Sequence, residues 1–383
     1  MNILFLALDI NINNKTGDSI HVRELATSLA KLGHNITLIT ATPLFQKIES
    51  LQTQENLLLY FREDRGNLST FSFCGKVIKR HNPDIIYERR FSAKIGATLS
   101  KIHRIPLIIE VNGLVEEEAK IVGTAIKQFI LVKKFKKWMR KRFFKRASRI
   151  VTVSNGIKKG LHEQYGIPIG KMVVIPNGAN TELFKPMDKD ICKRELNLDT
   201  NNKYVCFTGN LVPWQGVEYL IKAAPNVLKE EPSARFIIVG DGMMRNELEN
   251  IAKELDIIDK VIFTGGVLYE LVPKYINASE IGISIKPPLL PGSPLKVKEY
   301  MACGKPVIAT RNSEYDFEII EKADAGVLVK PGDKEEVANA ILRLLSNSNL
   351  SKEMGLRGRN LVVEKYSWMS TAKKVIENCK KSL

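Results

Sequence analysis

Apolar residues in this chain occur mainly in short continuous runs rather than in alternation with polar residues. Such runs are typical of parallel strands in a sheet that is covered on both faces. Two successive cycles of these runs predict an α/β chain with two doubly wound, Rossmann-like domains. The predicted strands are Ile3–Leu8, Ile36–Thr40, Leu57–Phe61, Ile85–Tyr87, Leu107–Val111, Ile150–Val153 and Val173–Ile175 in the first cycle, and Tyr204–Thr208, Phe236–Val239, Val261–Thr264, Ile281–Ile285, Val307–Thr310 and Val327–Val329 in the second.

Turn residues separate the two cycles. Asn177-Gly178 and Pro186 interrupt the apolar pattern, so we expect a domain over 1–180, a second over 181–365 and a final helical segment over 366–383. A length of 383 residues fits two cores better than one. Ligands are then expected at the carboxyl ends of the strands and in the interdomain cleft.

The segment over 292–310 predicts a tight loop, a short helix and a buried strand. Ser293 is the expected N-cap, and Pro294 suits the first helical position. Lys296 is unusual in the first turn, because a cation there faces the positive end of the helix dipole. A phosphate bound at that helix end would explain it. The alternative is an ordinary helix with a solvated lysine.

A glycine also precedes the first predicted helix. Gly17 permits close approach of a ligand to the backbone at a helix start, and His21 follows one turn later. The functional interpretation is a loop that faces a ligand. The alternative is a cap and turn with a packed histidine.

The composition limits the functional classes to which the chain can belong. The chain is 44% hydrophobic and 26% charged, which is typical of globular proteins, but its net charge of +16 implies an anionic partner. Five cysteines without C-x-x-C spacing favour reduced thiols in the cytoplasm and argue against a zinc site. The apolar start of the chain reads as a buried strand rather than a signal peptide, and no apolar run approaches the ~20 residues that span a bilayer.

Part of the positive charge is concentrated over residues 127–149, which hold eleven Lys or Arg residues and no acid. An apolar stripe over Val132, Phe135, Met139, Phe143 and Ala147 predicts a helix. One interpretation is an interfacial helix on anionic lipid, and the other is a docked surface helix with a solvated basic face. A nucleic-acid-binding protein would need stacking aromatics or a recognition helix, which we do not find. The expected lipid-facing residues are Lys133, Lys137, Trp138, Arg140, Lys141, Arg142 and Phe144.

Six motifs in order resemble those of family-four retaining glycosyltransferases, and the resemblance covers essentially the whole chain. It implies a GT-B architecture, with the acceptor mainly on the first domain and a nucleotide-sugar donor mainly on the second. It further implies retention of anomeric configuration, no metal requirement, and a last helix that returns to the first domain and places Trp368 near the hinge. The motifs are TGDSIHVRELATSLAKLGHNITLIT, VTVSNGIKKGL, VIPNGANTELFKP, FTGNLVPWQGVEYLIKAAP, VGDGMMRNELENIAKELDIIDKVIFTGGV and SPLKVKEYMACGKPVIAT.

The match to the family is uneven. Glu299 matches the second acidic residue of the Glu-x7-Glu motif, which resembles a ribose-binding carboxylate, but the first position falls on Pro291. The usual basic pair of the donor domain falls on Asn210 and Gln215. The frequent histidine at the end of an acceptor-side strand falls on Asn112.

These departures resemble a set of coordinated substitutions, as in a variant subgroup of the family, rather than the loss of the family's motifs. A subgroup with Tyr-Glu-Arg, Glu-x-Asn and a Trp-containing loop is similar to Tyr87–Arg89, Glu110–Asn112 and Trp214–Gly216. Lys296 is then the main candidate to neutralise the negative charge of the diphosphate, with Arg89 or Arg90 as weaker candidates.

The candidate residues form three sets. The catalytic candidates are Asn112, Lys296 and Glu299, with no metal ligand and no cofactor. The acceptor-side candidates are His21, Arg89, Asn112 and Asn177. The donor-binding candidates are Gly17, Gly209, Asn210, Gln215, Gly266, Val267, Ser293, Leu295, Lys296 and Glu299.

The resemblance thus implies a retaining hexosyltransferase. It would move a hexose or N-acetylhexosamine from a nucleoside diphosphate sugar, UDP-linked by expectation, to a lipid-linked or glycan acceptor. We expect it to act in polysaccharide biosynthesis as a peripheral protein on the cytoplasmic face of the cell membrane. The alternatives are a nucleotide-sugar epimerase, a phosphorylase-like GT-B enzyme or a basic nucleic-acid-binding protein.

Overall fold

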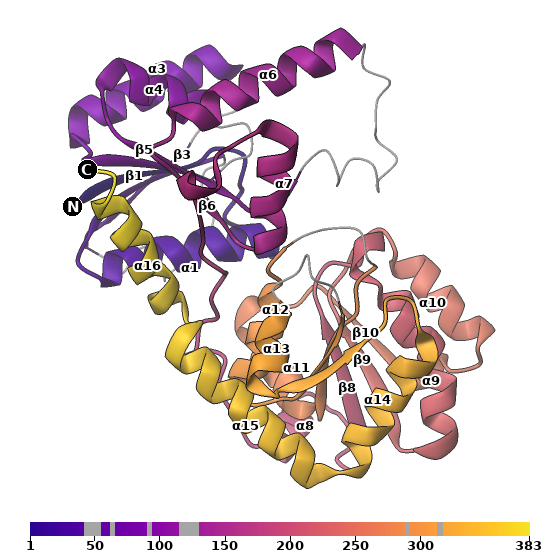
Figure 1. Ribbon diagram of the computed structural model, residues 1–383. Coiled ribbons are helices and arrows are strands. Elements are labelled where there is room, and N and C mark those ends of the chain that lie inside the picture. Colours follow the sequence, from indigo (N-terminus) through magenta and orange to yellow (C-terminus); the bar gives the residue numbers. More distant parts are fainter. Residues whose placement is uncertain (42–54, 62–65, 90–93, 115–129, 288–291, 312–316) are drawn as a thin grey trace. The chain divides into compact units, whose positions relative to one another are not determined.

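A computed structural model of the chain describes residues 1–41, 55–61, 66–89, 94–114, 130–287, 292–311 and 317–383 (Figure 1). It contains two compact units. The first unit comprises Met1–Asn177, Pro291–Ser293 and Trp368–Leu383. The second comprises Gly178–Leu290 and Pro294–Ser367.

The first unit is built on a seven-stranded parallel sheet with the order β3-β2-β1-β4-β5-β6-β7. Helices α3, α4 and α6 lie on one face of this sheet, and α1 and α16 lie on the other (Figure 1). The strands are β1 (Asn2–Ala7), β2 (Asn35–Thr40), β3 (Leu57–Phe61), β4 (Ile85–Arg89), β5 (Leu107–Val111), β6 (Arg149–Thr152) and β7 (Met172–Val174). The helices are α1 (Gly17–Lys31), α3 (Gly66–His81), α4 (Lys94–His103), α6 (Ile130–Arg146), α7 (Asn155–Tyr165), η1 (Ile169–Lys171) and α16 (Trp368–Lys380).

The second unit has a six-stranded parallel sheet with the order β10-β9-β8-β11-β12-β13, the doubly wound order of dinucleotide-binding folds. Its strands are β8 (Lys203–Thr208), β9 (Ala234–Val239), β10 (Val261–Gly265), β11 (Ile281–Ser284), β12 (Val307–Thr310) and β13 (Gly326–Val329). Its helices are α8 (Lys189–Glu195), η2 (Pro213–Gln215), α9 (Val217–Glu230), α10 (Arg245–Glu254), η3 (Ile258–Lys260), η4 (Tyr269–Leu271), α11 (Val272–Ala278), α12 (Leu295–Ala302), α13 (Glu318–Ala323), α14 (Lys334–Ser346) and α15 (Ser348–Lys365).

The prediction of two doubly wound α/β domains is confirmed. The continuous apolar runs form strands that are buried on both faces, as Ile3–Ala7 of β1 and Tyr204–Thr208 of β8 illustrate. Their side chains on each face pack under helices, which accounts for the absence of alternation in the sequence.

The chain enters the second unit at Gly178 and finally leaves it after Ser367, and the residues at these two points lie close together. Ala179 and Ser367, both in the second unit, form a parallel β-bridge, and the Ala179 N–H donates to the Tyr366 carbonyl over 2.9 Å. One residue further on, α16 begins at Trp368 and packs on α1 within the first unit. The last helix therefore completes the layer of helices that the first helix of the chain begins.

Two local predictions are wrong. Ser293 is not the N-cap of α12, because the helix begins at Leu295 and Pro294 occupies the capping position. Phe144, which we expected to face lipid, is fully buried, whereas Phe135 of the apolar stripe is 61% exposed. The true apolar face of α6 therefore follows Phe143, Phe144 and Ala147.

Candidate functional site

In the second unit, Lys296 reaches from the first turn of α12 to the carboxyl end of β8. Its ammonium donates to Gln215 Oε1 over 2.9 Å and lies 3.8 Å from the centroid of the Phe207 ring. Gly209 leaves room for it, since a Cβ at that residue would come within 2.8 Å of Lys296 Nζ. The φ of Gly209 is +136°, a conformation that other residues rarely adopt.

The electrostatic environment of Lys296 disfavours its charge. Burial, and then the charge of Lys286, lower the pKa of Lys296 well below its ordinary value, while Glu299 acts in the opposite direction. Among the described residues, Lys296 forms no ion pair with a carboxylate; its oxygen partner is the neutral amide of Gln215. A buried cation with this set of neighbours favours an anionic ligand.

Lys286 is a residue that our sequence analysis did not identify. It follows β11, is buried, and donates its backbone N–H to Thr310 Oγ1 at the end of β12 over 2.6 Å. A signal was present, because a lysine directly after an apolar parallel strand lies at the edge of the sheet where ligands bind in this fold class. Lys286 and Lys296 thus place two buried cations at one sheet edge.

Glu299 lies one turn after Lys296 and is also buried. Its Oε1 accepts a hydrogen bond from the Tyr269 hydroxyl over 3.3 Å, and the Tyr269 ring packs on Phe184 with centroids 5.2 Å apart. A carboxylate held in this way offers acceptors to the hydroxyl groups of a ligand.

The other donor-binding candidates are more dispersed. Asn210 is exposed beyond Gly209, and Gly266 and Val267 follow β10. Leu295 is the first residue of α12. Gly17, the first residue of α1, and Ser293 belong to the first unit. The geometry therefore brings Gly209, Gln215 and Lys296 into direct contact, with Glu299 one turn further along.

In the first unit, Glu110 is the centre of a buried polar network. Tyr87 donates its hydroxyl to Glu110 Oε2, and His21 Nε2 lies 2.7 Å from Oε1. Burial alone would raise the pKa of this carboxyl. The charge of His21 and its hydrogen bond, followed by the charge of Arg89, outweigh burial and hold the pKa of Glu110 at about 2.

Arg89 extends this network to the start of α1. The register of β4 and β5 places Arg89 opposite Glu110, with its Nε 3.9 Å from Glu110 Oε1. Its Nη2 donates to Asp18 Oδ1 over 2.6 Å. Arg90 lies outside the described residues.

The middle residue of the Tyr-Glu-Arg motif has a structural role. Glu88 Oε2 accepts a hydrogen bond from the Gly96 N–H in the first turn of α4 over 3.0 Å. A Cβ on Gly96 would lie 2.3 Å from that oxygen. The three residues therefore act in different places: Tyr87 and Arg89 hold Glu110, and Glu88 caps a helix.

Asn177 and Asn112 complete the acceptor-side candidates. Asn177 accepts from His21 through Oδ1, donates its amide to the Ser293 carbonyl over 2.7 Å, and donates its backbone N–H to Ser293 Oγ over 3.3 Å. Asn112 follows β5 and is half-buried. Its Oδ1 is buried without a hydrogen-bond partner among the described residues.

The basic helix α6 exposes part of the predicted set. Lys137, Trp138 and Arg142 are exposed, while Arg140 and Lys141 are half-buried. The side chain of Lys133 lies outside the description. The assignment of Phe144 to the lipid-facing set is wrong, because Phe144 is buried and packs edge-on against Tyr165.

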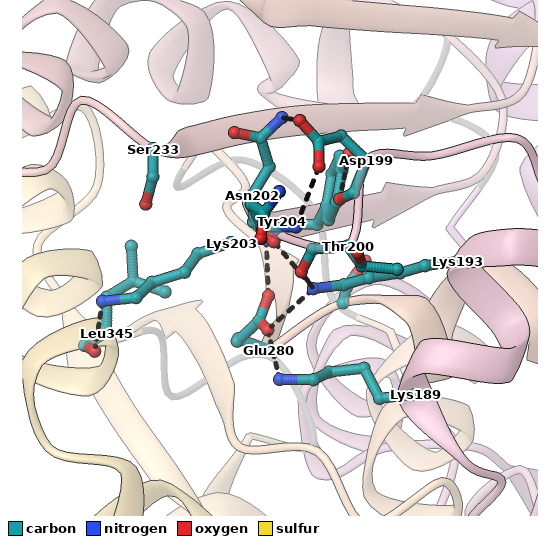
Figure 2. Close-up of polar contacts among 12 residues, drawn as sticks. Lys189, Lys193, Asp199, Thr200, Asn202, Lys203, Tyr204, Ser233, Glu280 and Leu345 are labelled. Atoms are coloured by element: carbon teal, nitrogen blue, oxygen red, sulfur yellow. Dashed lines mark hydrogen bonds and ion pairs between the residues drawn. The ribbon is translucent and has the colours of Figure 1, made fainter.

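A different buried lysine of the second unit, Lys193, has three oxygen neighbours and lies 5.3 Å from the Tyr204 ring centroid. Lys193 Nζ donates to the carbonyls of Asn202 and Thr200 over 2.7 and 3.3 Å, and lies 3.6 Å from Glu280 Oε1. Figure 2 shows Lys189 reaching the same carboxylate. This cluster joins α8, the loop before β8 and the residue before β11, and it serves the fold.

In the part of the chain that the structure describes, no group of three or more His, Cys, Asp or Glu side chains is placed to hold a metal ion. No helix within the described ranges is long and apolar enough to cross a membrane.

Family models match both halves of the chain: Glycosyltransferase Family 4 over residues 16–183 and Glycosyl transferases group 1 over residues 188–361. An uncharacterized glycosyltransferase from Methanocaldococcus jannaschii is 24% identical over 94% of this chain and 93% of its own length. UDP-Gal:alpha-D-GlcNAc-diphosphoundecaprenol alpha-1,3-galactosyltransferase from Escherichia coli is 24% identical over 78% of this chain and 76% of its own.

A solved structure has the same fold. Anabaena HepE in complex with UDP and glucose has a TM-score of 0.78 and 22% identity, and the match covers 100% of this chain and 99% of that one.

Proposed function

Because the chain belongs to the family-four glycosyltransferases with GT-B architecture, we propose that it transfers a hexose or N-acetylhexosamine from a UDP-linked donor to a lipid-linked acceptor. In this proposal, the transfer retains the anomeric configuration and uses no metal ion. The nucleotide follows the UDP complex of the Anabaena protein, and the acceptor class follows the name of the Escherichia coli relative. Both assignments are proposals for this chain.

One observation supports the donor site most strongly: the buried ammonium of Lys296 beside the buried Lys286. A diphosphate would neutralise this cluster and accept hydrogen bonds from the first turn of α12. Glu299, one turn away, would accept hydrogen bonds from the ribose hydroxyls.

The transfer step balances without a covalent enzyme intermediate. The bond from the sugar's anomeric carbon to the leaving phosphate oxygen breaks, while a bond to the acceptor oxygen forms on the same face. The proton of the acceptor hydroxyl passes to the departing phosphate. Lys296 and Lys286 stabilise the charge that develops on that phosphate, and such preorganised groups are worth roughly 2.7–4 kcal/mol each.

Asn112 is the proposed orienting residue for the reacting hydroxyl or sugar. Its buried Oδ1 has no partner among the described residues, and it follows a buried parallel strand. An amide oxygen with this geometry accepts a hydrogen bond from a ligand hydroxyl. Asn112→Ala should reduce turnover without unfolding the protein, and wild-type turnover in this variant would contradict the role.

We place the acceptor at an anionic membrane surface that α6 binds. Phe135 and Trp138 are exposed and stack with centroids 5.9 Å apart, and Arg142 lies 4.8 Å from the Trp138 ring centroid. Aromatic rings with basic neighbours suit the interface of a bilayer. Each nearby basic residue adds on the order of 1 kcal/mol, within a Debye length of ~8 Å at physiological salt.

Vesicle sedimentation tests this placement. Binding to phosphatidylglycerol vesicles should be strong at low salt and weak at high salt. It should drop sharply when Lys137, Arg140, Lys141 and Arg142 become Gln. The matched control changes four exposed lysines of the second unit to Gln, namely Lys222, Lys229, Lys334 and Lys352. If the α6 variant sediments like the wild type, α6 is a docked surface helix only.

The donor and reaction are tested together. Thermal shifts with UDP, GDP and ADP should single out UDP, since a ligand at 100 times its Kd adds about 2.7 kcal/mol of stability. Radiolabelled UDP-sugars should then label a polyprenyl-diphosphate-linked acceptor, and NMR of the product should show the donor's anomeric configuration. Acceptor-independent conversion of the UDP-sugar into its epimer would instead support the epimerase alternative.

A further inference from the structure

Strands β8 and β11 are neighbours in the middle of the second unit's sheet, and the chain runs outward from them in opposite directions. Their boundary is the topological switch point, where ligands bind in folds of this class. On their outer sides, β8 pairs with β9 as far as Thr208, and β11 pairs with β12 as far as Ser284. With each other, the two strands pair only as far as Cys206 and Gly282. They therefore separate before their carboxyl ends.

The Tyr300 hydroxyl, from α12, lies where this pairing stops. In the ladders of this sheet, an N–H donates to the carbonyl of the residue before its partner, as the Gly282 N–H does toward β12. Continued pairing would thus join the Thr208 N–H to the Ile283 carbonyl. Instead, the Thr208 N–H donates to the Tyr300 hydroxyl over 2.8 Å, and the hydroxyl donates to the Ile283 carbonyl over 3.2 Å. One hydroxyl group therefore takes the place of one ladder hydrogen bond.

Tyr300 is held at both ends of its side chain. Its hydroxyl also accepts from Thr208 Oγ1 over 3.1 Å, so its single proton and both of its acceptor positions are used. Burial raises the pKa of Tyr300 well above its ordinary value, so the hydroxyl keeps the proton that it donates. The ring lies over Gly282, where a Cβ would come within 2.3 Å of Tyr300 Cγ. The separation of the strands is therefore built into the packed core of the unit.

The two separated strand ends support different parts of the proposed donor site. Gly209 directly follows β8 and leaves room for the Lys296 ammonium. Gln215, which accepts from that ammonium, precedes Gly216, and a Cβ on Gly216 would lie 2.4 Å from the Ile285 carbonyl just beyond β11. Lys296 thus contacts one group at the end of β8 and another that is packed on the end of β11.

We propose that Tyr300 is a positioning residue of the donor site: its hydroxyl holds the carboxyl ends of β8 and β11 apart and so sets the spacing at which Gly209 and Gln215 hold Lys296 for a diphosphate. The part of this inference that concerns the diphosphate rests on the proposed function. The part that concerns the strands does not.

Crystal structures of the wild type and of Tyr300→Phe test the separation of the strands. The variant keeps the ring but leaves the buried Thr208 N–H and Ile283 carbonyl without the hydroxyl. Because unpaired buried backbone groups are costly, we expect the strands to close and Thr208 N to lie within about 3.2 Å of Ile283 O. The proposal is overturned if these atoms stay as far apart as in the wild type, or if the wild type already pairs them directly.

Calorimetry with UDP tests the positioning role. Tyr300→Phe should weaken UDP binding at least tenfold, because closure of the strands changes the spacing around Lys296. Tyr204→Phe is the matched control, since it also removes a buried hydroxyl that donates to a carbonyl, that of Asp199 over 3.1 Å, but at the amino end of β8. It should lower the free energy of unfolding and leave the Kd for UDP within about twofold of wild type.

A purely structural role for Tyr300 would lower stability and leave the Kd unchanged. If Tyr300→Phe fails to fold, Gly282→Ala replaces it, because the added Cβ displaces the ring together with its hydroxyl. A wild-type Kd for UDP in whichever variant is folded overturns the positioning role. If the wild type itself binds no UDP, the proposed function fails, and the crystal structures still decide whether Tyr300 separates the strands.

Discussion

Lys193 and Lys296 are both buried lysines of the second unit, at 2% and 8% exposure, and their surroundings differ in kind. Both ammonium groups lie near an aromatic ring, but Lys193 also donates to two backbone carbonyls and pairs with Glu280. Lys296 has an aromatic ring and one neutral amide oxygen, with a second cation nearby. The fold balances the first charge, whereas the second has no carboxylate ion-pair partner among the described residues, as expected for the donor site that we propose.

This contrast gives a criterion for deciding whether a buried lysine is a candidate for binding a ligand or serves only to stabilise the fold. Burial alone does not identify a functional cation, because Lys193 is the more buried of the two. What distinguishes Lys296 is the deficit of negative partners, since a charge that the protein does not neutralise must meet a ligand or remain costly. Substitutions at the two positions should therefore affect different properties.

The largest effect is expected from Lys296→Met. The rate of transfer at saturating donor should fall roughly 10²–10³-fold, because a preorganised group that stabilises the leaving phosphate is lost. The free energy of unfolding should remain close to wild type, since the variant removes a buried charge. Steady-state kinetics and urea unfolding measure both, and a wild-type rate would exclude Lys296 from the donor site.

Lys193→Met should show the opposite pattern. The free energy of unfolding should drop by about 2–3 kcal/mol, because hydrogen bonds to a charged donor are lost and Glu280 keeps fewer partners. The Kd for UDP should not change. If urea unfolding shows wild-type stability, the cluster in Figure 2 contributes nothing measurable and the contrast with Lys296 fails.

Lys286→Met should weaken UDP binding about tenfold, or about 1.4 kcal/mol. The expected loss is smaller than for Lys296 because Lys296 remains to contact the diphosphate. The same substitution should also raise the pKa of Lys296 toward its ordinary value, because a neighbouring positive charge is removed. Calorimetry measures the affinity, and an unchanged Kd would leave Lys296 as the single cation of the proposed site.

The smallest effect is a pH dependence. Because the pKa of Lys296 is lowered, its ammonium loses its proton at a pH below the ordinary value of 10.5, and UDP affinity should begin to fall there. Lys296→Met controls for ionisation of UDP itself, since any remaining dependence belongs to the ligand. Identical pH profiles for the two proteins would contradict the assignment.

The fold could be predicted because its determinants are local in sequence. Each predicted strand is a short apolar run, and parallel sheets covered on both faces produce such runs directly. The error on α6 has a physical reason as well. Spacing of three or four residues identifies a helix, but two neighbouring stripes shared that spacing, and only the packing of Phe144 on Tyr165 selects between them.

The contacts of the candidate site could be predicted only in part, because they join residues far apart in the chain, and its role stays a prediction. Lys296 stood out as a cation in an unfavourable helix turn, and Glu299 through a motif. The sequence contains no sign that His21 meets Glu110 across 89 positions, or that Gly209 makes room for Lys296. Lys286 was overlooked because a strand-end lysine has no motif of its own.

The position of α16 has a consequence for the synthesis of the protein. The first unit includes Trp368–Leu383, so it lacks its last helix until the ribosome has made the whole second unit. At about 5–20 residues per second, the intervening chain takes roughly 10–40 s to emerge. During that interval the surface of α1 beside His21 has no Trp368 to cover it. A nascent chain of this protein should therefore recruit chaperones until its final helix is released.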